Sequence, residues 1–235
     1  MRILVEPSDF ELVNLGDMAM MRVAIERLAA LWPHASIEVF SEVPDLLSAF
    51  CPEATPILAR CVYGRPQIRN RRTRLADLVE KLRSRRPAFA TYYPVEMLEA
   101  LSRADLMVVP GMGGLTDAFP EYAFGLLDRM DLALRAGTPV VMVGQGIGPL
   151  EDPVLRTRAQ EILRQVGFIS LREARASYPL LRSLGVPPGR ITTTGDDSIE
   201  TAFSLRSTRL GAGLGINVRA APYSGVGPQD QKSVV

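Results

Sequence analysis

The sequence is poor in cysteine and histidine, and it has no long hydrophobic run. Its two cysteines, Cys51 and Cys61, are too few for a disulfide framework, so we expect a protein of the reducing cytoplasm. No Cys/His cluster has the spacing of zinc ligands, and we expect no metal site. No segment approaches the ~20 apolar residues of a membrane-spanning helix, and the first ten residues lack the apolar core of an export signal. We therefore expect a soluble protein.

The chain also lacks the common nucleotide-binding motifs. It contains no Walker A sequence, which argues against a P-loop NTPase, and no G-x-G-x-x-G fingerprint after its first strand. The 235 residues carry 27 basic and 26 acidic side chains, and this near balance argues against a nucleic-acid-binding protein. The 47% of hydrophobic residues suffice for the core of a mid-sized domain and exclude a disordered chain.

One segment departs from this charge balance. Arg65–Arg86 contains nine basic and two acidic residues. The segment is either a solvated helix face or a patch that draws an anionic acceptor, or an acidic membrane surface, toward the protein. The second interpretation would place the protein at the inner face of the membrane.

Short apolar runs alternate with helical stretches, and this pattern predicts the fold class. Continuous apolar strands separated by helices are typical of a parallel sheet that is covered on both faces. We expect an α/β fold, a doubly wound, Rossmann-like parallel sheet, over residues 1–204. The predicted strands are 3–5, 37–40, 56–58, 106–109, 140–143, 168–171 and 191–194, and the predicted helices are 17–31, 45–50, 122–136, 153–166 and 177–184. Ser177 is expected to cap the last of these helices.

The sequence changes character after residue 204. Residues 205–213 are polar and contain glycine, so we expect a linker, and 214–218 has the pattern of a new strand. No helical pattern follows it, and we expect residues 214–235 to be the start of a truncated second domain with a mobile tail over 220–235. The chain would then be a fragment, a frameshifted product or an inactive remnant, and we expect little activity from it alone.

Glycine-rich or charged loops follow the predicted strands. Ligands of doubly wound sheets bind at the carboxyl ends of the strands, where glycine lets the backbone approach an anion closely. Each glycine by itself can also serve only a tight turn. From these loops we select as candidate substrate-binding residues Asn14, Gly16, Gly113, Gly114, Asp117, Gln145, Gly146, Gly148, Glu173 and Asp196.

Two charged residues at this edge have two interpretations each. Asp17 is either a carboxylate favoured by the start of a helix or a group that orients or deprotonates a hydroxyl. Arg172 is either a surface arginine or a guanidinium that holds a carboxylate or phosphate with two parallel hydrogen bonds. We take both as candidate catalytic residues. The only histidine, His34, lies in a helix-to-strand loop, which belongs to the opposite edge of the sheet.

Six short motifs follow one another along residues 1–219. They are N-L-G-D-M-A at 14–19, G-M-G-G-L-T-D at 111–117, G-Q-G-I-G-P at 144–149, S-L-R-E at 170–173, G-D-D at 195–197 and L-G-I-N-V-R at 214–219. Together they resemble the polysaccharide pyruvyl transferase family. The resemblance implies a GT-B-like enzyme that moves the pyruvyl unit of phosphoenolpyruvate onto a sugar of a cell-surface or exopolysaccharide precursor, as a ketal.

The resemblance also implies roles for the candidate residues. Asp17 would act on the acceptor hydroxyl, and Arg172 would hold an anionic group of phosphoenolpyruvate, which is the co-substrate of an enzyme without a cofactor. The acceptor would be a saccharide, either free or linked to a lipid. The sequence departs from the family in having Ala176 where a serine is usual, with Ser177 one place later. The Arg…His segment that would supply an acid/base histidine is not within the 235 residues.

Two other functions stay open at this point. One is half of a GT-B glycosyltransferase that uses a nucleotide sugar, and the other is a non-catalytic binding subunit. Release of phosphate from phosphoenolpyruvate that depends on a sugar acceptor would distinguish the transferase from both.

Overall fold

The computed structural model describes residues 1–59, 93–207, 211 and 213. Several sequence-based expectations fall outside these residues and stay predictions. They concern Cys61, the basic segment Arg65–Arg86, the strand expected at 214–218 and the mobile tail at 220–235.

Seven strands of the described residues form one parallel sheet. Their order across the sheet is β3-β2-β1-β4-β5-β6-β7, so the direction of winding reverses between β1 and β4. This confirms the predicted doubly wound, Rossmann-like α/β fold. The strands are β1 (Arg2–Val5), β2 (Ser36–Ser41), β3 (Ala54–Leu58), β4 (Leu106–Val109), β5 (Val140–Gln145), β6 (Phe168–Leu171) and β7 (Ile191–Thr193).

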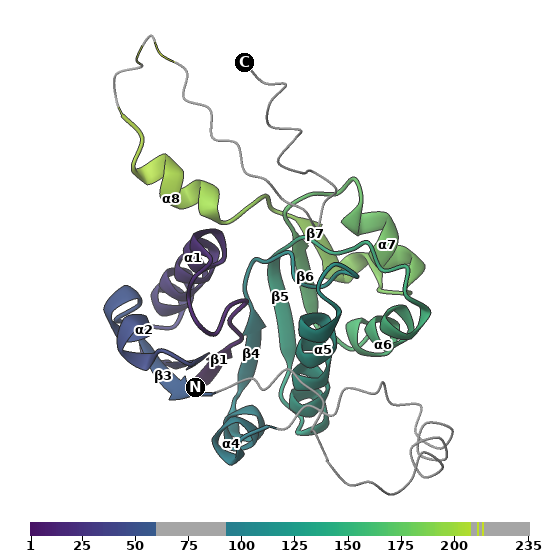
Figure 1. Cartoon of the computed structure of the whole chain (residues 1–235), viewed down its shortest axis with the longest axis horizontal. Helices are drawn as coiled ribbons and strands as arrows, with labels where there is room; N and C mark the ends of the chain where they lie inside the picture. The colour runs from purple at the N-terminus through teal and green to yellow at the C-terminus, as the bar shows by residue number, and fades with distance from the viewer. Residues whose placement is uncertain (60–92, 208–210, 212, 214–235) are drawn as a thin grey trace, which may run out of the picture.

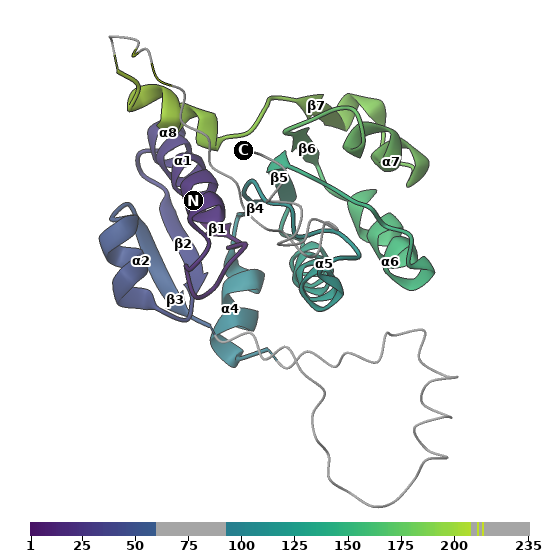
Figure 2. The same ribbon diagram turned by 45° about the horizontal axis from the view of Figure 1, so that its top comes forward.

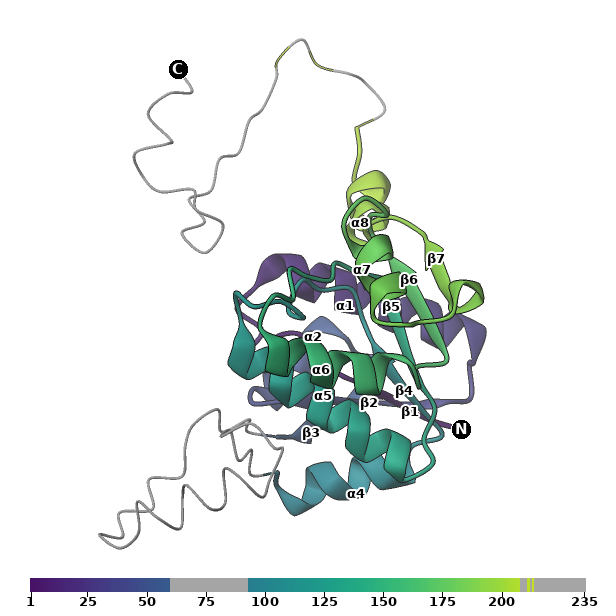
Figure 3. The same cartoon turned by 90° about the vertical axis from the view of Figure 1, so that its right-hand side faces the viewer.

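Helices cover both faces of the sheet (Figures 1 and 3). One face carries α1 (Leu15–Leu31) and α2 (Pro44–Phe50). The opposite face carries α4 (Val95–Arg103), α5 (Pro120–Arg135), α6 (Pro153–Leu163) and α7 (Ser177–Ser183). After β7 the chain crosses back, and α8 (Ser198–Ser204) packs against α1 (Figure 2). None of these helices has the length and hydrophobicity that crossing a membrane requires.

The two faces have separate hydrophobic cores, and β1 shows how the strand pattern produces them. Leu4 packs with the core under α4 to α7, whereas Ile3 and Val5 pack with the core under α1 and α2. Successive side chains of a strand point to opposite faces, so a run of apolar residues contributes to both cores. All three side chains are fully buried.

A buried ion pair lies directly after β1. Glu6 and Arg129 of α5 are both completely buried, and the Arg129 Nε and Nη2 atoms lie 2.8 and 2.5 Å from Glu6 Oε1. The Arg129 guanidinium also lies 5.2 Å from the ring centre of Phe10 in the β1–α1 loop. Burial raises the pKa of the Glu6 carboxyl, and Arg129 offsets part of this effect. The pair thus joins β1, α5 and the loop that leads to α1.

The sequence prediction missed some of these elements. It contained neither α4 nor α8, and it extended the 153–166 helix beyond the observed end of α6 at Leu163. The capping role expected of Ser177 is wrong. Ser177 is the first residue of α7 rather than its N-cap, and its buried Oγ accepts a hydrogen bond from the Ile147 backbone at 3.0 Å. This hydroxyl therefore connects α7 to the loop after β5.

Candidate active site at the carboxyl edge of the sheet

Asn14 and Asp17 are linked at the start of α1. Asn14 caps the helix, because its Oδ1 accepts a hydrogen bond from the Gly16 backbone at 3.1 Å. The Asn14 Nδ2 donates to Asp17 Oδ2 at 2.8 Å. Asp17 is half-buried in the first turn of the helix, where its negative charge is favoured. The cap therefore also fixes the orientation of the carboxylate.

The loop before this cap is held by a single carboxylate. Asp9 accepts hydrogen bonds from the backbone of Glu11, Val13 and Asn14 at 3.1, 2.7 and 2.8 Å. Val13 and Leu15 are 74% and 79% exposed, and they line a hollow together with Asn14 and Gly16. Asp17 thus lies beside an open, partly apolar surface.

The glycine loops after β4 and β5 run side by side. The Gly146 backbone donates to the Met112 carbonyl at 2.8 Å, and the Gly148 backbone donates to the Leu115 carbonyl at 2.9 Å. Gly111 packs closely against Met20 of α1, because a Cβ on this glycine would lie 2.9 Å from the Met20 sulfur. Both loops therefore lie at the same sheet edge as Asp17, as predicted.

Arg172, which follows β6, lies across both glycine loops. A Cβ on Gly146 would be 2.5 Å from Arg172 Nε, and a Cβ on Gly113 would be 3.0 Å from Arg172 Nη2. A side chain at Gly146 would displace the guanidinium from its present position, and one at Gly113 would press against it. Among the described residues the guanidinium makes no hydrogen bond, and its ion-pair partner is Asp196, at 3.8 Å from Nη1 to Oδ2. The arginine is about one-third exposed and can accept an anion.

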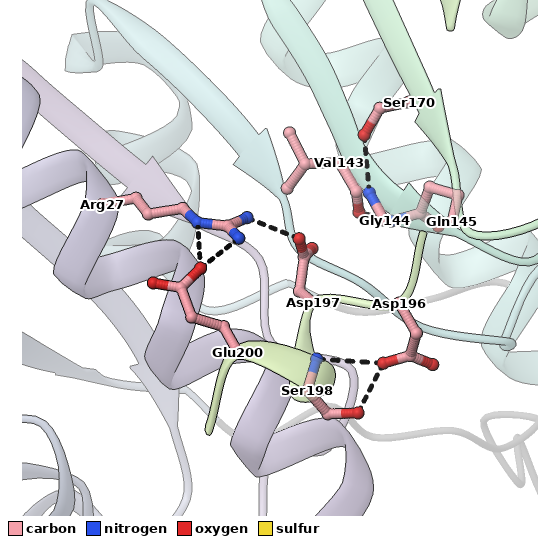
Figure 4. A network of polar contacts seen from close by, with 9 residues as sticks. All are labelled: Arg27, Val143, Gly144, Gln145, Ser170, Asp196, Asp197, Ser198 and Glu200. Carbon is pink, nitrogen blue, oxygen red and sulfur yellow. Dashed lines mark hydrogen bonds and ion pairs between the residues drawn. The ribbon is translucent and has the colours of Figure 1, made fainter. Parts of the chain in front are cut away.

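The two aspartates after β7 point in different directions (Figure 4). The Asp196 Oδ1 accepts hydrogen bonds from the Ser198 backbone and hydroxyl at 3.0 and 2.5 Å. Asp197 is buried, and its Oδ1 lies 2.6 Å from Arg27 Nη1 on α1. Arg27 also pairs with Glu200 of α8. This network, Arg27–Asp197–Glu200, holds α8 and the β7–α8 turn against α1.

Asp197 also explains the glycine at the end of β5. Gly144 has a φ of +60°, and a Cβ there would lie 2.2 Å from Asp197 Oδ2. The Gly144 backbone donates to Ser170 Oγ at 2.8 Å (Figure 4). Through the contact between Asp197 and Gly144, the β7–α8 turn packs against the end of β5.

Three predicted substrate-binding side chains are engaged by the protein itself. Gln145 is fully buried, and its Nε2 donates to the carbonyls of Val109, Pro110 and Val143 at 3.1, 2.5 and 3.0 Å. Its Oε1 is buried and has no hydrogen-bond partner among the described residues. Through these bonds Gln145 joins the ends of β4 and β5.

The carboxylates of Asp117 and Glu173 are likewise engaged. Asp117 accepts hydrogen bonds from the backbone of residues 151 and 152 at 2.5 and 3.3 Å. Glu173 accepts from the backbone of Ala176 and Ser177 at 2.8 and 2.9 Å and from the Ser177 hydroxyl. The Ser177 hydroxyl bond, followed by the backbone bonds, lowers the pKa of Glu173. Both carboxylates shape the loops around the site.

Other candidate groups lie elsewhere or are missing from the part of the chain that the structure describes. His34 is exposed in the α1–β2 loop, at the opposite edge of the sheet from Asp17. Within residues 1–59 and 93–207, no group of three His, Cys, Asp or Glu side chains is arranged to hold a metal ion. Asp17, Arg172 and Asp196 thus lie at the carboxyl edge together with the carboxylates of Asp117, Glu173 and Asp197, which other parts of the chain engage.

Sequence reasoning missed Arg27 and Asp197 as supports of this site. Asp197 had a visible signal, since it follows Asp196 in the G-D-D segment. Arg27 had none, because its partners lie 170 and 173 residues further along the chain.

We expect Gly146→Ala to weaken anion binding at least tenfold while leaving the fold intact. The new methyl group would displace the Arg172 guanidinium, the flexible end of a side chain, and Gly146 has no left-handed backbone. Titration calorimetry with inorganic phosphate measures the binding, and thermal unfolding measures the fold. Gly189→Ala is the matched control, because no atom lies within 4 Å of its added Cβ. Equal phosphate affinity in both variants would contradict the inference that anion binding needs the space beside Gly146.

Comparison with known proteins gives one result. The sequence model of one family, described as polysaccharide pyruvyl transferase, matches residues 14–222. No curated protein matches the chain. The matched region begins at Asn14 and includes every candidate residue of the carboxyl edge.

Proposed function

The chain belongs to the polysaccharide pyruvyl transferase family, and from this premise we propose that it transfers the pyruvyl unit of phosphoenolpyruvate onto a saccharide acceptor as a ketal. One observation carries the proposal most directly. The Arg172 guanidinium lies across two glycine loops at the carboxyl edge of the sheet and makes no hydrogen bond to the described residues. Asp17 lies at the same edge.

In this proposal Arg172 and the glycine loops hold the donor. Phosphoenolpyruvate carries a carboxylate and a phosphate, and either group matches the planar fork of a guanidinium. Gly113 and Gly146 leave the space that the arginine occupies. Gln145, Asp117 and Glu173 hold the surrounding loops through the contacts described above.

Asp17 would act on the acceptor. As a base it removes the proton of a sugar hydroxyl, whose oxygen then bonds to the central carbon of the donor. The donor's methylene carbon takes up a proton to become a methyl group, and the bond to phosphate breaks. A second hydroxyl of the same sugar loses its proton and closes the ketal, and the phosphate leaves with one proton. The leaving group belongs to the donor, so the scheme uses no cofactor.

The acid for the methylene carbon is proposed to come from a second domain. We propose that residues 205–213 are the linker to this second domain and that residues 214–235 are its start. The acceptor is proposed to be a precursor of a cell-surface polysaccharide, attached to a lipid at the inner face of the membrane. Under this proposal Asp17 and Arg172 form one wall of a cleft.

Acceptor-dependent release of phosphate from phosphoenolpyruvate tests this function. It is measured for the 235-residue chain and for the chain joined to the second half of a family member. We expect release from the joined protein and little from the chain alone. Asp17→Asn should lower kcat about 10²-fold or more with a small change in KM, because it removes a base while keeping the side-chain size.

Glu99→Gln is the control for the Asp17 variant. Glu99 is an exposed carboxylate on α4, which covers the other face of the sheet. Absence of acceptor-dependent release from both proteins would overturn the proposed function. Unchanged turnover in Asp17→Asn would remove Asp17 from the chemistry.

A further inference from the structure

We propose that Asp196 is an internal counter-ion that competes with anionic ligands for Arg172, and so sets how tightly the site retains an anion. The inference deepens the proposed function and rests on it only for the identity of the product, inorganic phosphate. It concerns a carboxylate that lies beside the anion site and carries the same charge as the ligand.

The two oxygens of Asp196 have different surroundings. Oδ1 is occupied by the Ser198 backbone and hydroxyl, which fixes the side chain in the β7–α8 turn. Oδ2 lies 3.8 Å from Arg172 Nη1, close enough for charge attraction but too far for a hydrogen bond. Figure 4 shows this second oxygen directed away from Ser198.

The carboxylate has little freedom to leave. The next residue, Asp197, is buried and paired with Arg27, and Asp197 is packed against Gly144. Because the turn is anchored on both α1 and the end of β5, Asp196 stays near the guanidinium when a ligand arrives.

A ligand on Arg172 therefore meets two opposing charges. The guanidinium attracts it through N–H donors that make no hydrogen bond to the described residues, and Asp196 repels it at short range. The Arg172–Asp196 pair is partly exposed and lacks a hydrogen bond, so it is weak, and a ligand can occupy the N–H donors of Arg172 while Asp196 remains beside it. Such an arrangement favours release of a simple anion, such as the phosphate product, over its retention.

Removing only the charge of Asp196 tests the proposal, because the affinity for phosphate should then rise. Asp196→Asn keeps an oxygen for the Ser198 bonds but removes the repulsion. We expect inorganic phosphate to bind the 235-residue chain about fivefold to thirtyfold more tightly in this variant, by titration calorimetry. Damage to the fold would weaken binding instead.

Three further variants isolate the effect. Asp196→Glu keeps the charge and should bind phosphate nearly as the wild type does. Asp196→Asn combined with Arg172→Met should lose the gain. Asp45→Asn removes an exposed carboxylate on α2, far across the sheet from β6, and should change nothing.

Equal or weaker phosphate binding in Asp196→Asn, including absence of binding in both proteins, would overturn the proposal. So would a gain that persists without Arg172. Tighter binding in Asp196→Asn together with absent pyruvyl transfer would support the counter-ion while refuting the proposed function. The two failures are therefore distinguishable.

Discussion

The Arg129→Met variant is expected to lose about 3–5 kcal/mol of the free energy of unfolding. Arg129 and Glu6 have no solvent exposure, and their ion pair joins β1 to α5. Removing the guanidinium leaves the Glu6 carboxylate buried without its cation, and methionine restores much of the packing volume but none of the charge. Urea denaturation followed by circular dichroism measures the loss.

A second substitution separates the pair from the packing around it. Adding Glu6→Leu to Arg129→Met should recover most of the lost stability, because a buried pair replaced by apolar side chains is often neutral. Arg135→Met on the same helix is the control. Arg135 is 71% exposed and pairs with Asp131, so its loss should cost under about 1 kcal/mol. A small effect of Arg129→Met alone would mean that the pair contributes little.

Arg172→Lys is expected to lower the affinity for phosphoenolpyruvate about tenfold to a hundredfold. Lysine keeps the positive charge but loses the two parallel N–H bonds, and a hydrogen bond to a charged group contributes about 1.5–3 kcal/mol. The loss should be seen in direct binding by calorimetry and, in an active protein, as a higher KM for the donor.

The control for this substitution lies three residues away. Arg175 is exposed in the β6–α7 loop, and Arg175→Lys makes the same chemical change outside the candidate site. We expect its donor affinity to match that of the wild type. Equal affinity in Arg172→Lys would exclude Arg172 from the donor site.

Much of the fold could be predicted because its signals are local. The apolar runs of β1, β4, β5 and β6 are bounded by glycine, proline or charged residues. The helix after β4 ends at Arg135, two residues before Gly137, whose φ is +87°. The helices α4 and α8 were missed. Both are short, with nine and seven residues, and α8 has no buried residue that would mark an apolar face.

The candidate site could be predicted only as a location. Parallel strands place their carboxyl ends at one edge, so the loops could be brought together from the strand pattern alone. Their side-chain roles depend on partners that are distant in sequence. Gln145 has the residue type of a ligand contact, yet its amide is used by Val109 and Pro110, 36 and 35 residues away.

The Arg27–Asp197–Glu200 network has a consequence for the order of events during synthesis. Arg27 meets partners that are translated 170 and 173 residues later. At roughly 5–20 residues per second, the ribosome makes them about 9–35 s after Arg27. Until then α1 can pack on β1 and β2, but α8 cannot dock on it. In a nascent chain arrested before residue 197, Asp197 would be missing and the end of β5 at Gly144 would stay uncovered. We expect a protease to cleave the arrested chain near Gly144 more readily than the full chain.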